Sequence, residues 1–187
     1  RVEVLKGPQG TLYGRNATGG AVNIITNDPS HDASLQAQIG FGNRETMEGS
    51  LYATGGLAEG VSADIAAYYR NQGKGFGYNS TIQQDINKSR DFAIRSKLAF
   101  ELGETTRLVL AGDYSYSNST IGAAYRAVPT SRLLDGSVGY NGRYWDSTSE
   151  FEGFLISRIY GGSAKLEQDL GDFKLTSITA YRGFKGY

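Results

Sequence analysis

Apolar and polar side chains alternate with a period of two along most of the chain from residue 33 onward. Such alternation predicts strands with one apolar and one polar face. Five segments show it, at about 35–42, 47–54, 61–70, 91–102 and 107–116. The alternation is weaker at about 154–169, and a last strand is predicted at 173–183, which makes seven strands. Helical periodicity is nearly absent, so we predict an all-β arrangement of antiparallel, up-and-down hairpins.

The connections between these segments alternate in length. Tight turns occur near 57–60, 103–106 and 170–172, long connections at 71–90 and 118–150, and a short turn at 43–45 is the exception. Short turns at one rim and long loops at the other are typical of β-barrels in the bacterial outer membrane. Strands of this length also suit a bilayer, since a tilted membrane strand needs about 9–11 residues. The pattern therefore favours a membrane barrel.

Four tyrosines lie near the strand ends that lead into the long loops: Tyr68, Tyr69, Tyr114 and Tyr116. Aromatic side chains in such places suit a girdle at the membrane–water interface. Ordinary strand aromatics are the alternative, because tyrosine has a high β propensity on any sheet. The loop lengths make us favour the girdle.

The first 27 residues have a different pattern. A short alternating segment at 2–5 precedes a region punctuated by glycines, and an apolar run at 21–26 follows it. Pro8 fixes φ and suits the start of a turn, and the Gly19–Gly20 pair permits a positive φ. We expect a strand, a Gly-rich turn with room for one helical turn, and a second strand. A phosphate-binding loop is disfavoured because neither glycine motif of such loops is present.

The string VEVLKGPQGTLYGRNATGGAVNIIT, at residues 2–26, resembles the end of the plug domain of TonB-dependent outer-membrane receptors. The family pattern there is roughly V-E-V-L-(R/K)-G-P-x-(G/S)-x-L-Y-G-x-x-A-x-G-G-x-(V/I)-N-(I/V)-x-(T/S). This chain matches nearly every fixed position, with Lys6 where arginine is commoner. The motif residues to which the resemblance gives a structural role are Gly7, Pro8, Leu12, Tyr13, Gly14, Arg15, Gly19, Gly20 and Asn23.

The resemblance implies a fragment of a plugged transmembrane antiparallel β-barrel, with about seven strands after a short plug remnant. We place the C-terminal part of the plug domain at residues 1–30 and the incomplete, N-terminal part of the barrel at residues 31–187. Barrels with a plugged lumen have about 22 strands, and an open sheet edge in hydrocarbon leaves backbone groups unpaired. We therefore expect the chain to be part of a longer protein.

The composition gives little support to an enzymatic function. The chain has no cysteine, and its one histidine, His31, lies in the connector before the first barrel strand. A Ser–His hydrolase needs an imidazole beside its nucleophile, and zinc sites need His or Cys ligands. Charges balance at 19 against 19, so nothing indicates a nucleic-acid partner. We expect no enzymatic activity, no cofactor and no metal site.

A binding role has better support in the longest loop. Its candidate ligand contacts are Tyr125, Arg126, Arg132, Tyr140, Arg143, Tyr144 and Trp145. Aromatic rings and arginines together suit a bulky, often anionic ligand. The preceding loop adds Lys74, Phe76 and Tyr78, and the alternative is that all of these are ordinary loop residues. In the plug-like turn, we expect Arg15 to pair with an acidic residue of the barrel wall.

The resemblance implies a receptor and transporter in the outer membrane of a Gram-negative bacterium. Such a protein takes up a scarce solute, here expected to be a ferric siderophore, when TonB moves the plug. The implied partners are TonB, through a segment missing here, the outer-membrane lipid and the small-molecule ligand. The alternative is a non-transporting outer-membrane β-barrel or an adhesin that uses its loops for binding. The plug-like stretch discriminates between them, because the alternative has no use for it.

Overall fold

The computed structural model describes residues 1–13, 17–121, 130, 132, 135–138 and 143–187. One antiparallel sheet dominates it, with the strand order β11-β10-β9-β8-β5-β4-β3. Its strands are β3 (Ser34–Gly42), β4 (Thr46–Ala58), β5 (Val61–Gln72), β8 (Ser89–Leu102), β9 (Thr106–Ile121), β10 (Gly153–Asp169) and β11 (Lys174–Gly186). The predicted seven strands and their up-and-down order are therefore confirmed.

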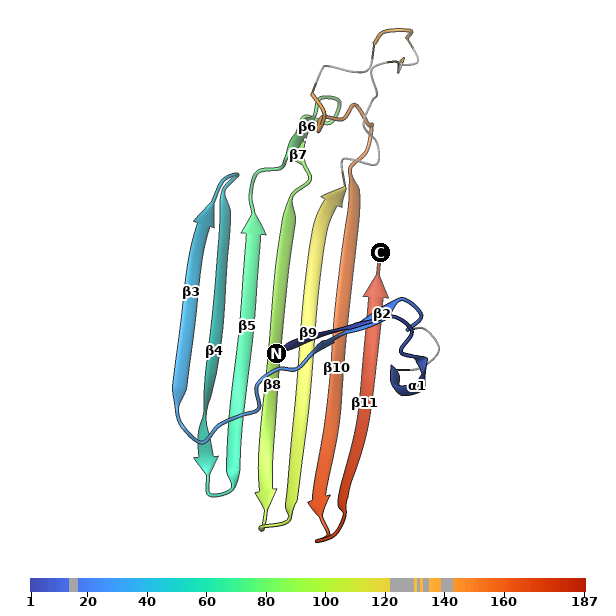
Figure 1. Cartoon of the computed structure of the whole chain (residues 1–187). Helices are drawn as coiled ribbons and strands as arrows, with labels where there is room; N and C mark the ends of the chain where they lie inside the picture. Colours follow the sequence, from blue (N-terminus) through green and yellow to red (C-terminus); the bar gives the residue numbers. More distant parts are fainter. Residues whose placement is uncertain (14–16, 122–129, 131, 133–134, 139–142) are drawn as a thin grey trace.

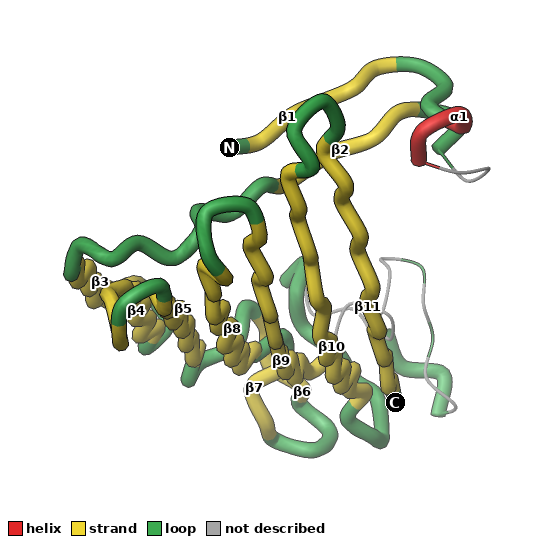
Figure 2. The backbone as a smooth tube through the Cα atoms, turned by 90° about the horizontal axis from the view of Figure 1, so that it is seen from below, coloured by secondary structure: helices red, strands yellow, loops and turns green. Residues whose placement is uncertain are grey.

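The plug-like stretch forms the predicted strand, turn and strand. Its elements are β1 (Val2–Lys6), the single helical turn α1 (Gly10–Tyr13) and β2 (Gly20–Ile24). β1 and β2 pair antiparallel, with Val2 opposite Ile24 and Lys6 opposite Gly20. This hairpin lies on the concave side of the large sheet (Figures 1 and 2). Within the described residues, no helix is both long and apolar enough to cross a membrane.

Two predictions about the loops are wrong in detail. The connection predicted as one long loop at 71–90 contains a small hairpin, β6 (Gly77–Asn79) with β7 (Gln84–Ile86). β9 also continues to Ile121, into the segment predicted to be loop. Its residues 117–120 are all polar and carry no apolar alternation, and pairing with β8 and β10 is what extends the strand.

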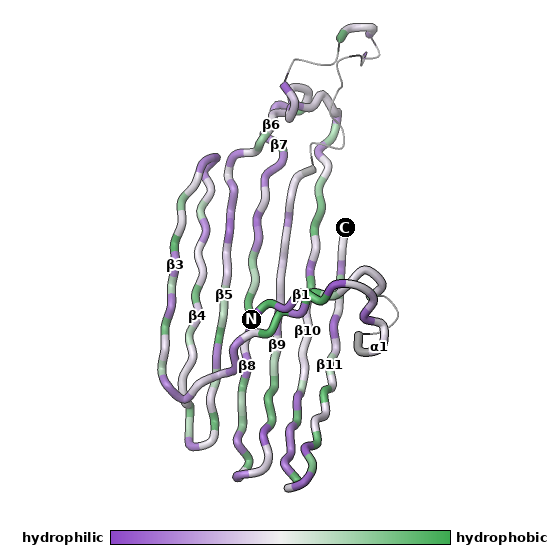
Figure 3. Tube along the Cα trace, viewed as in Figure 1, coloured by the Kyte–Doolittle hydropathy of each residue, from purple (hydrophilic) through white to green (hydrophobic). Residues whose placement is uncertain are grey.

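Hydrophilic and hydrophobic residues are interspersed along the strands (Figure 3), and the ladder register assigns them to the two faces of the sheet. Residues that stand opposite one another in a ladder point to the same face. One row across the sheet is Leu35, Ala53, Ile65, Ser96, Gly112, Gly162 and Tyr181. The adjacent row is Gln36, Tyr52, Ala66, Arg95, Asp113, Gly161 and Arg182. The second, polar row faces the β1–β2 hairpin.

The convex face exposes a broad apolar surface. Ile39 and Phe41 are 77% and 80% exposed, and Leu35 is 70% exposed. Such a surface is unfavourable in water and suits hydrocarbon. Among the predicted girdle residues, the register places Tyr69, Tyr114 and Tyr116 on this face. Tyr68 lies on the concave face, so including it in the girdle was wrong.

Candidate functional site

Two residues in the turn between β3 and β4 have an unfavourable backbone conformation. Arg44 and Glu45 have φ values of 63° and 54°, in the left-handed region that non-glycine residues resist. The Arg44 guanidinium donates a hydrogen bond of 2.8 Å to the Gly75 carbonyl and lies 4.5 Å from the centre of the Phe76 ring. The Glu45 carboxylate lies 2.9 Å from the Lys74 ammonium, which raises the pKa of Lys74. These contacts fasten the turn to the β5–β6 connection.

Asn79 fixes the end of the β6–β7 hairpin to the segment that precedes β10. Its side chain is buried, and Nδ2 donates to the Ser149 carbonyl at 2.9 Å. Oδ1 accepts from the backbone N–H groups of Thr81 at 3.0 Å and Ile82 at 3.4 Å. A buried amide with its groups satisfied in this way specifies one arrangement of the loops.

Further bonds extend this contact between segments about 70 residues apart. The backbone N–H of Tyr78 donates to the Asp146 carboxylate at 3.0 Å, and Asn79 forms a parallel bridge with Ser147. A Cβ at Gly77 would collide with the Trp145 carbonyl. Glycine is therefore required for the hairpin to approach this segment so closely.

Three aromatic side chains cluster at the loop end of the sheet, where the β3–β4, β5–β6 and β9–β10 connections meet. The Phe76 and Trp145 ring centres are 6.1 Å apart, and Tyr144 meets Trp145 edge-on at 4.8 Å. Each of these three rings keeps about half of its surface exposed. We call Arg44, Phe76, Tyr144 and Trp145 the mouth cluster. Its exposed rings and its cation could stack against a planar, anionic ligand.

The other predicted loop residues lie outside the mouth cluster or outside the described residues. Arg143 lies 4.0 Å from Asp146, and Arg132 forms an isolated bridge with Val138. Tyr125, Arg126 and Tyr140 lie outside the described residues. Of the seven predicted contacts, Tyr144 and Trp145 are thus the two placed in the mouth cluster.

In the plug-like stretch, two glycines adopt backbone conformations that other residues resist. Gly7 has a φ of 81°, and Gly20 has a φ of 142°. A Cβ on Gly20 would lie 2.5 Å from the Leu5 carbonyl oxygen, so the close pairing of β1 with β2 requires glycine there. The Asn23 amide donates to Glu3 at 3.1 Å across the same hairpin.

The remaining motif residues lie around the turn. Leu12 and Tyr13 belong to α1, Pro8 precedes that helical turn, and Gly19 precedes β2. Gly14 and Arg15 lie outside the described residues, so the expected pairing of Arg15 with the wall stays a prediction.

The connector after β2 is anchored to the concave wall by a lysine that the sequence alone did not single out for this role. The Lys97 side chain is only 8% exposed. Its ammonium donates to the Asn27 carbonyl at 2.7 Å, the Asp28 carboxylate at 3.0 Å and the Thr26 carbonyl at 3.4 Å. All three N–H groups of the lysine thus have an acceptor. We call this contact the connector anchor.

Asp28 extends the anchor to a second strand. Its other carboxylate oxygen accepts a hydrogen bond of 2.9 Å from Arg107 on β9. Burial alone would raise the pKa of Asp28, but the hydrogen bonds from Lys97 and Arg107 outweigh it and lower the pKa. The connector is therefore held to β8 and β9 by a carboxylate that stays ionised at neutral pH.

The connector is held further along as well. The Ser30 backbone N–H donates to the Thr54 hydroxyl at 2.9 Å, and the Gly56 N–H donates to the His31 carbonyl at 3.1 Å. The His31 ring lies 3.8 Å from the carboxylate of Glu101, at the end of β8. His31 thus belongs to the structural attachment of the connector.

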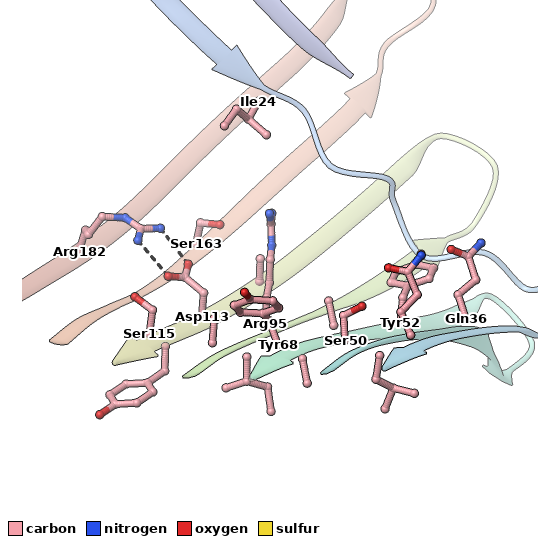
Figure 4. A pocket seen from close by; sticks show the side chains of 18 residues that line it. Ile24, Gln36, Ser50, Tyr52, Tyr68, Arg95, Asp113, Ser115, Ser163 and Arg182 are labelled. Atoms are coloured by element: carbon pink, nitrogen blue, oxygen red, sulfur yellow. Dashed lines mark hydrogen bonds and ion pairs between the residues drawn. The ribbon is translucent and has the colours of Figure 1, made fainter. Parts of the chain in front are cut away.

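Between the β1–β2 hairpin and the concave face of the large sheet lies an open hollow of 760 Å³ (Figure 4). Ile24 of β2 faces it from one side, and Gln36, Tyr52 and Arg95 line it on the sheet. At its far end, Arg182 and Asp113 form two hydrogen bonds of 2.9 and 2.8 Å. Within the described part of the chain, no group of three or more His, Cys, Asp or Glu side chains could hold a metal ion.

No protein-family model matches the chain. Among curated proteins, the catecholate siderophore receptor Fiu of Escherichia coli K12 is 31% identical over 110 residues, which cover 59% of this chain and 14% of Fiu. The probable TonB-dependent receptor BfrD of Bordetella pertussis is 25% identical over 97% of this chain and 24% of its own length. The chain therefore spans a quarter or less of these relatives.

Solved structures agree with the sequence relatives. The ferric-catecholate import receptor Fiu has a TM-score of 0.76 at 21% identity, covering 99% of this chain and 28% of its own. The ferric yersiniabactin uptake receptor FyuA from Yersinia pestis has a TM-score of 0.76 at 19% identity, with the same coverage. The chain is similar to TonB-dependent receptors in sequence and in fold, and corresponds to part of one. The seven-stranded sheet with its hairpin is a fragment of their plugged, antiparallel β-barrel.

Proposed function

We propose that the chain is part of an outer-membrane receptor that imports a ferric siderophore when TonB moves its plug. Residues 1–30 form the end of the plug domain, and residues 31–187 form the first part of the barrel. The outer membrane of a Gram-negative bacterium is its location. TonB acts on the plug domain.

The observation that carries the proposal is the connector anchor. A strand–turn–strand segment lies over the polar, concave face of a sheet whose other face is apolar, and Lys97 ties its outgoing connector to that face. In a membrane barrel that encloses a plug, the polar face of the sheet must meet the plug and the apolar face must meet the lipid. A non-transporting barrel or an adhesin needs only the sheet and the loops, so the anchor supports the receptor over these alternatives.

The mouth cluster supports the choice of solute. Relatives of the chain are named for catecholate siderophores, whose rings are planar and whose iron complexes are anionic. Exposed Trp145 and Tyr144 offer stacking surfaces, and Arg44 offers a cation beside them. An aromatic side chain that a ligand buries on binding is a common source of binding energy. Trp145 is therefore the residue that we expect to contribute most to affinity.

The experiment uses the full-length receptor, expressed in a Gram-negative strain that lacks its own catecholate receptors. Uptake of radioactive iron, supplied as a catecholate complex, should depend on the receptor and stop when TonB is deleted. The variant Trp145→Ala should weaken siderophore binding by about tenfold or more. Thr148→Ala is the matched control, because the contact of Thr148 with Thr81 uses its backbone carbonyl. TonB-independent adhesion without iron uptake would overturn the proposal.

A further inference from the structure

Charged side chains are distributed unequally between the two faces of the large sheet. The acidic residues of its strands, all in inward-facing register positions, are Glu48, Asp64, Asp91, Glu101, Asp113, Glu167 and Asp169. The convex face carries three charges, and all of them are basic: Arg90, Arg158 and Lys185. The convex surface of the described strands is therefore purely cationic wherever it is charged.

These three cations gather at the end of the sheet that carries the long loops. Lys185 stands opposite Arg158, Arg158 stands opposite Tyr116, and Tyr116 stands opposite Phe92. The Arg158 guanidinium lies 5.8 Å from the centre of the Tyr116 ring. Arg90 lies one outward row nearer the loops, opposite Asn71. Basic residues among aromatic ones mark the depth of lipid headgroups rather than of acyl chains.

Arg158 and Lys185 are like charges in directly opposite positions of neighbouring strands, an arrangement that destabilises a sheet. Both side chains are exposed. Within the described residues, no carboxylate lies within ion-pair distance of Arg158, Lys185 or Arg90. An anion from outside these strands would relieve the repulsion.

We propose that Arg158 and Lys185 bind the phosphate group of a lipid in the outer leaflet, with Arg90 on β8, two strands from Arg158, as a further cation of the same surface. The planar guanidinium can hold two phosphate oxygens, and the ammonium adds a third donor. Tyr160 and Tyr181, whose ring centres are 6.4 Å apart, continue the apolar surface on the side away from the loops and can contact acyl chains. A lipid phosphate fits this neighbourhood better than a free anion, because the surface on that side is apolar.

This inference rests on the outer-membrane location in the proposed function. The test titrates the purified full-length receptor with bisphosphorylated lipid A and with the same lipid after removal of its phosphates, and native mass spectrometry counts the bound lipid. The wild type should bind the phosphorylated form about tenfold or more tightly, since each cation near an anionic headgroup contributes to affinity. The variant Arg158→Gln/Lys185→Gln should lose that preference.

The matched control is Lys165→Gln/Arg182→Gln, which removes two cations from the same two strands but from the concave face. It should keep the wild-type preference. The single variant Lys185→Gln should give a smaller loss than the double variant and provides a second measure if the double variant folds poorly. Equal binding of both lipids, or an unchanged preference in the double variant, would overturn the inference. Iron uptake, measured separately, reports on the proposed function alone.

Discussion

Arg182 on β11 reaches across β10 and forms a two-point contact with Asp113 on β9, at 2.9 and 2.8 Å. The residue between them in the row is Gly161. A Cβ on Gly161 would lie 3.2 Å from the guanidinium and 3.0 Å from the Tyr181 carbonyl oxygen. The absence of a side chain at Gly161 is therefore what allows the contact to pass over β10.

The variant Gly161→Val should lower the stability of the full-length protein because its side chain displaces the Arg182 guanidinium. The ion pair itself contributes under about 1 kcal/mol, since Arg182 is 62% exposed. Backbone adjustment at Tyr181 adds to this, and we expect a total loss of about 1–2 kcal/mol in urea unfolding from lipid vesicles. Gly162→Val is the control, since a Cβ there meets only the Ala111 carbonyl at 3.5 Å. Equal losses in both variants would contradict this account.

Lys97→Met should loosen the connector without unfolding the sheet. The variant removes three hydrogen bonds to residues 26–28. Bonds to charged groups contribute about 1.5–3 kcal/mol each, but the partial exposure of Asp28 reduces the net effect. We expect backbone hydrogen exchange at residues 26–28 to accelerate by about tenfold.

Lys165→Met controls for the loss of a lysine from the same face. Its partner Glu167 retains Lys174 at 3.4 Å, so the connector should exchange as in the wild type. If connector exchange in Lys97→Met matches that of the control, the connector anchor is not what holds this segment.

The connector anchor should also respond to acid. The pKa of Asp28 in the folded state lies below its ordinary value of 3.8. Its contribution to stability is therefore complete above pH 3.8 and is lost as the pH falls through the lower folded value. A nitroxide attached at Asp32→Cys, read by electron paramagnetic resonance, should become more mobile in that acidic window.

Asp28→Asn is the control for this titration. Its label should be mobile at neutral pH and show no further transition in the acidic window. A wild-type transition centred above pH 3.8, or one that persists in Asp28→Asn, would assign the change to another group.

The period-two pattern was sufficient to predict the seven long strands, because the Arg95 and Asp113 row is polar and the Ile65 row beside it is apolar. The same local pattern contains no information on contacts between distant segments. Trp145 meets Phe76, and Lys97 meets Asp28, across about 70 residues of chain. The sequence was sufficient to identify Trp145 as an aromatic residue of a loop. Only the fold shows that Phe76 contacts Trp145 and that Arg44 lies over Phe76.

The role of Arg44 could not be predicted from the local sequence. The turn at 43–45 was predicted to be a short polar turn, with no role for its side chains. Its two positive φ values indicate that a glycine would fit better locally. Arginine and glutamate are accommodated there through contacts with Gly75, Phe76 and Lys74. Local preference and tertiary contact conflict at this turn, as is common at functional sites.

Arg44→Gly/Glu45→Gly should separate these two effects. Relief of two adverse φ values is worth about 1–2 kcal/mol each, so global stability should not fall. The loss of the Arg44 and Glu45 contacts should speed hydrogen exchange at residues 73–76 and weaken the proposed siderophore binding several-fold. Arg44→Lys is the control that keeps the charge but loses the planar stack on Phe76, and it should weaken binding less. Unchanged exchange at residues 73–76 in the glycine variant would mean that Arg44 and Glu45 do not position the mouth cluster.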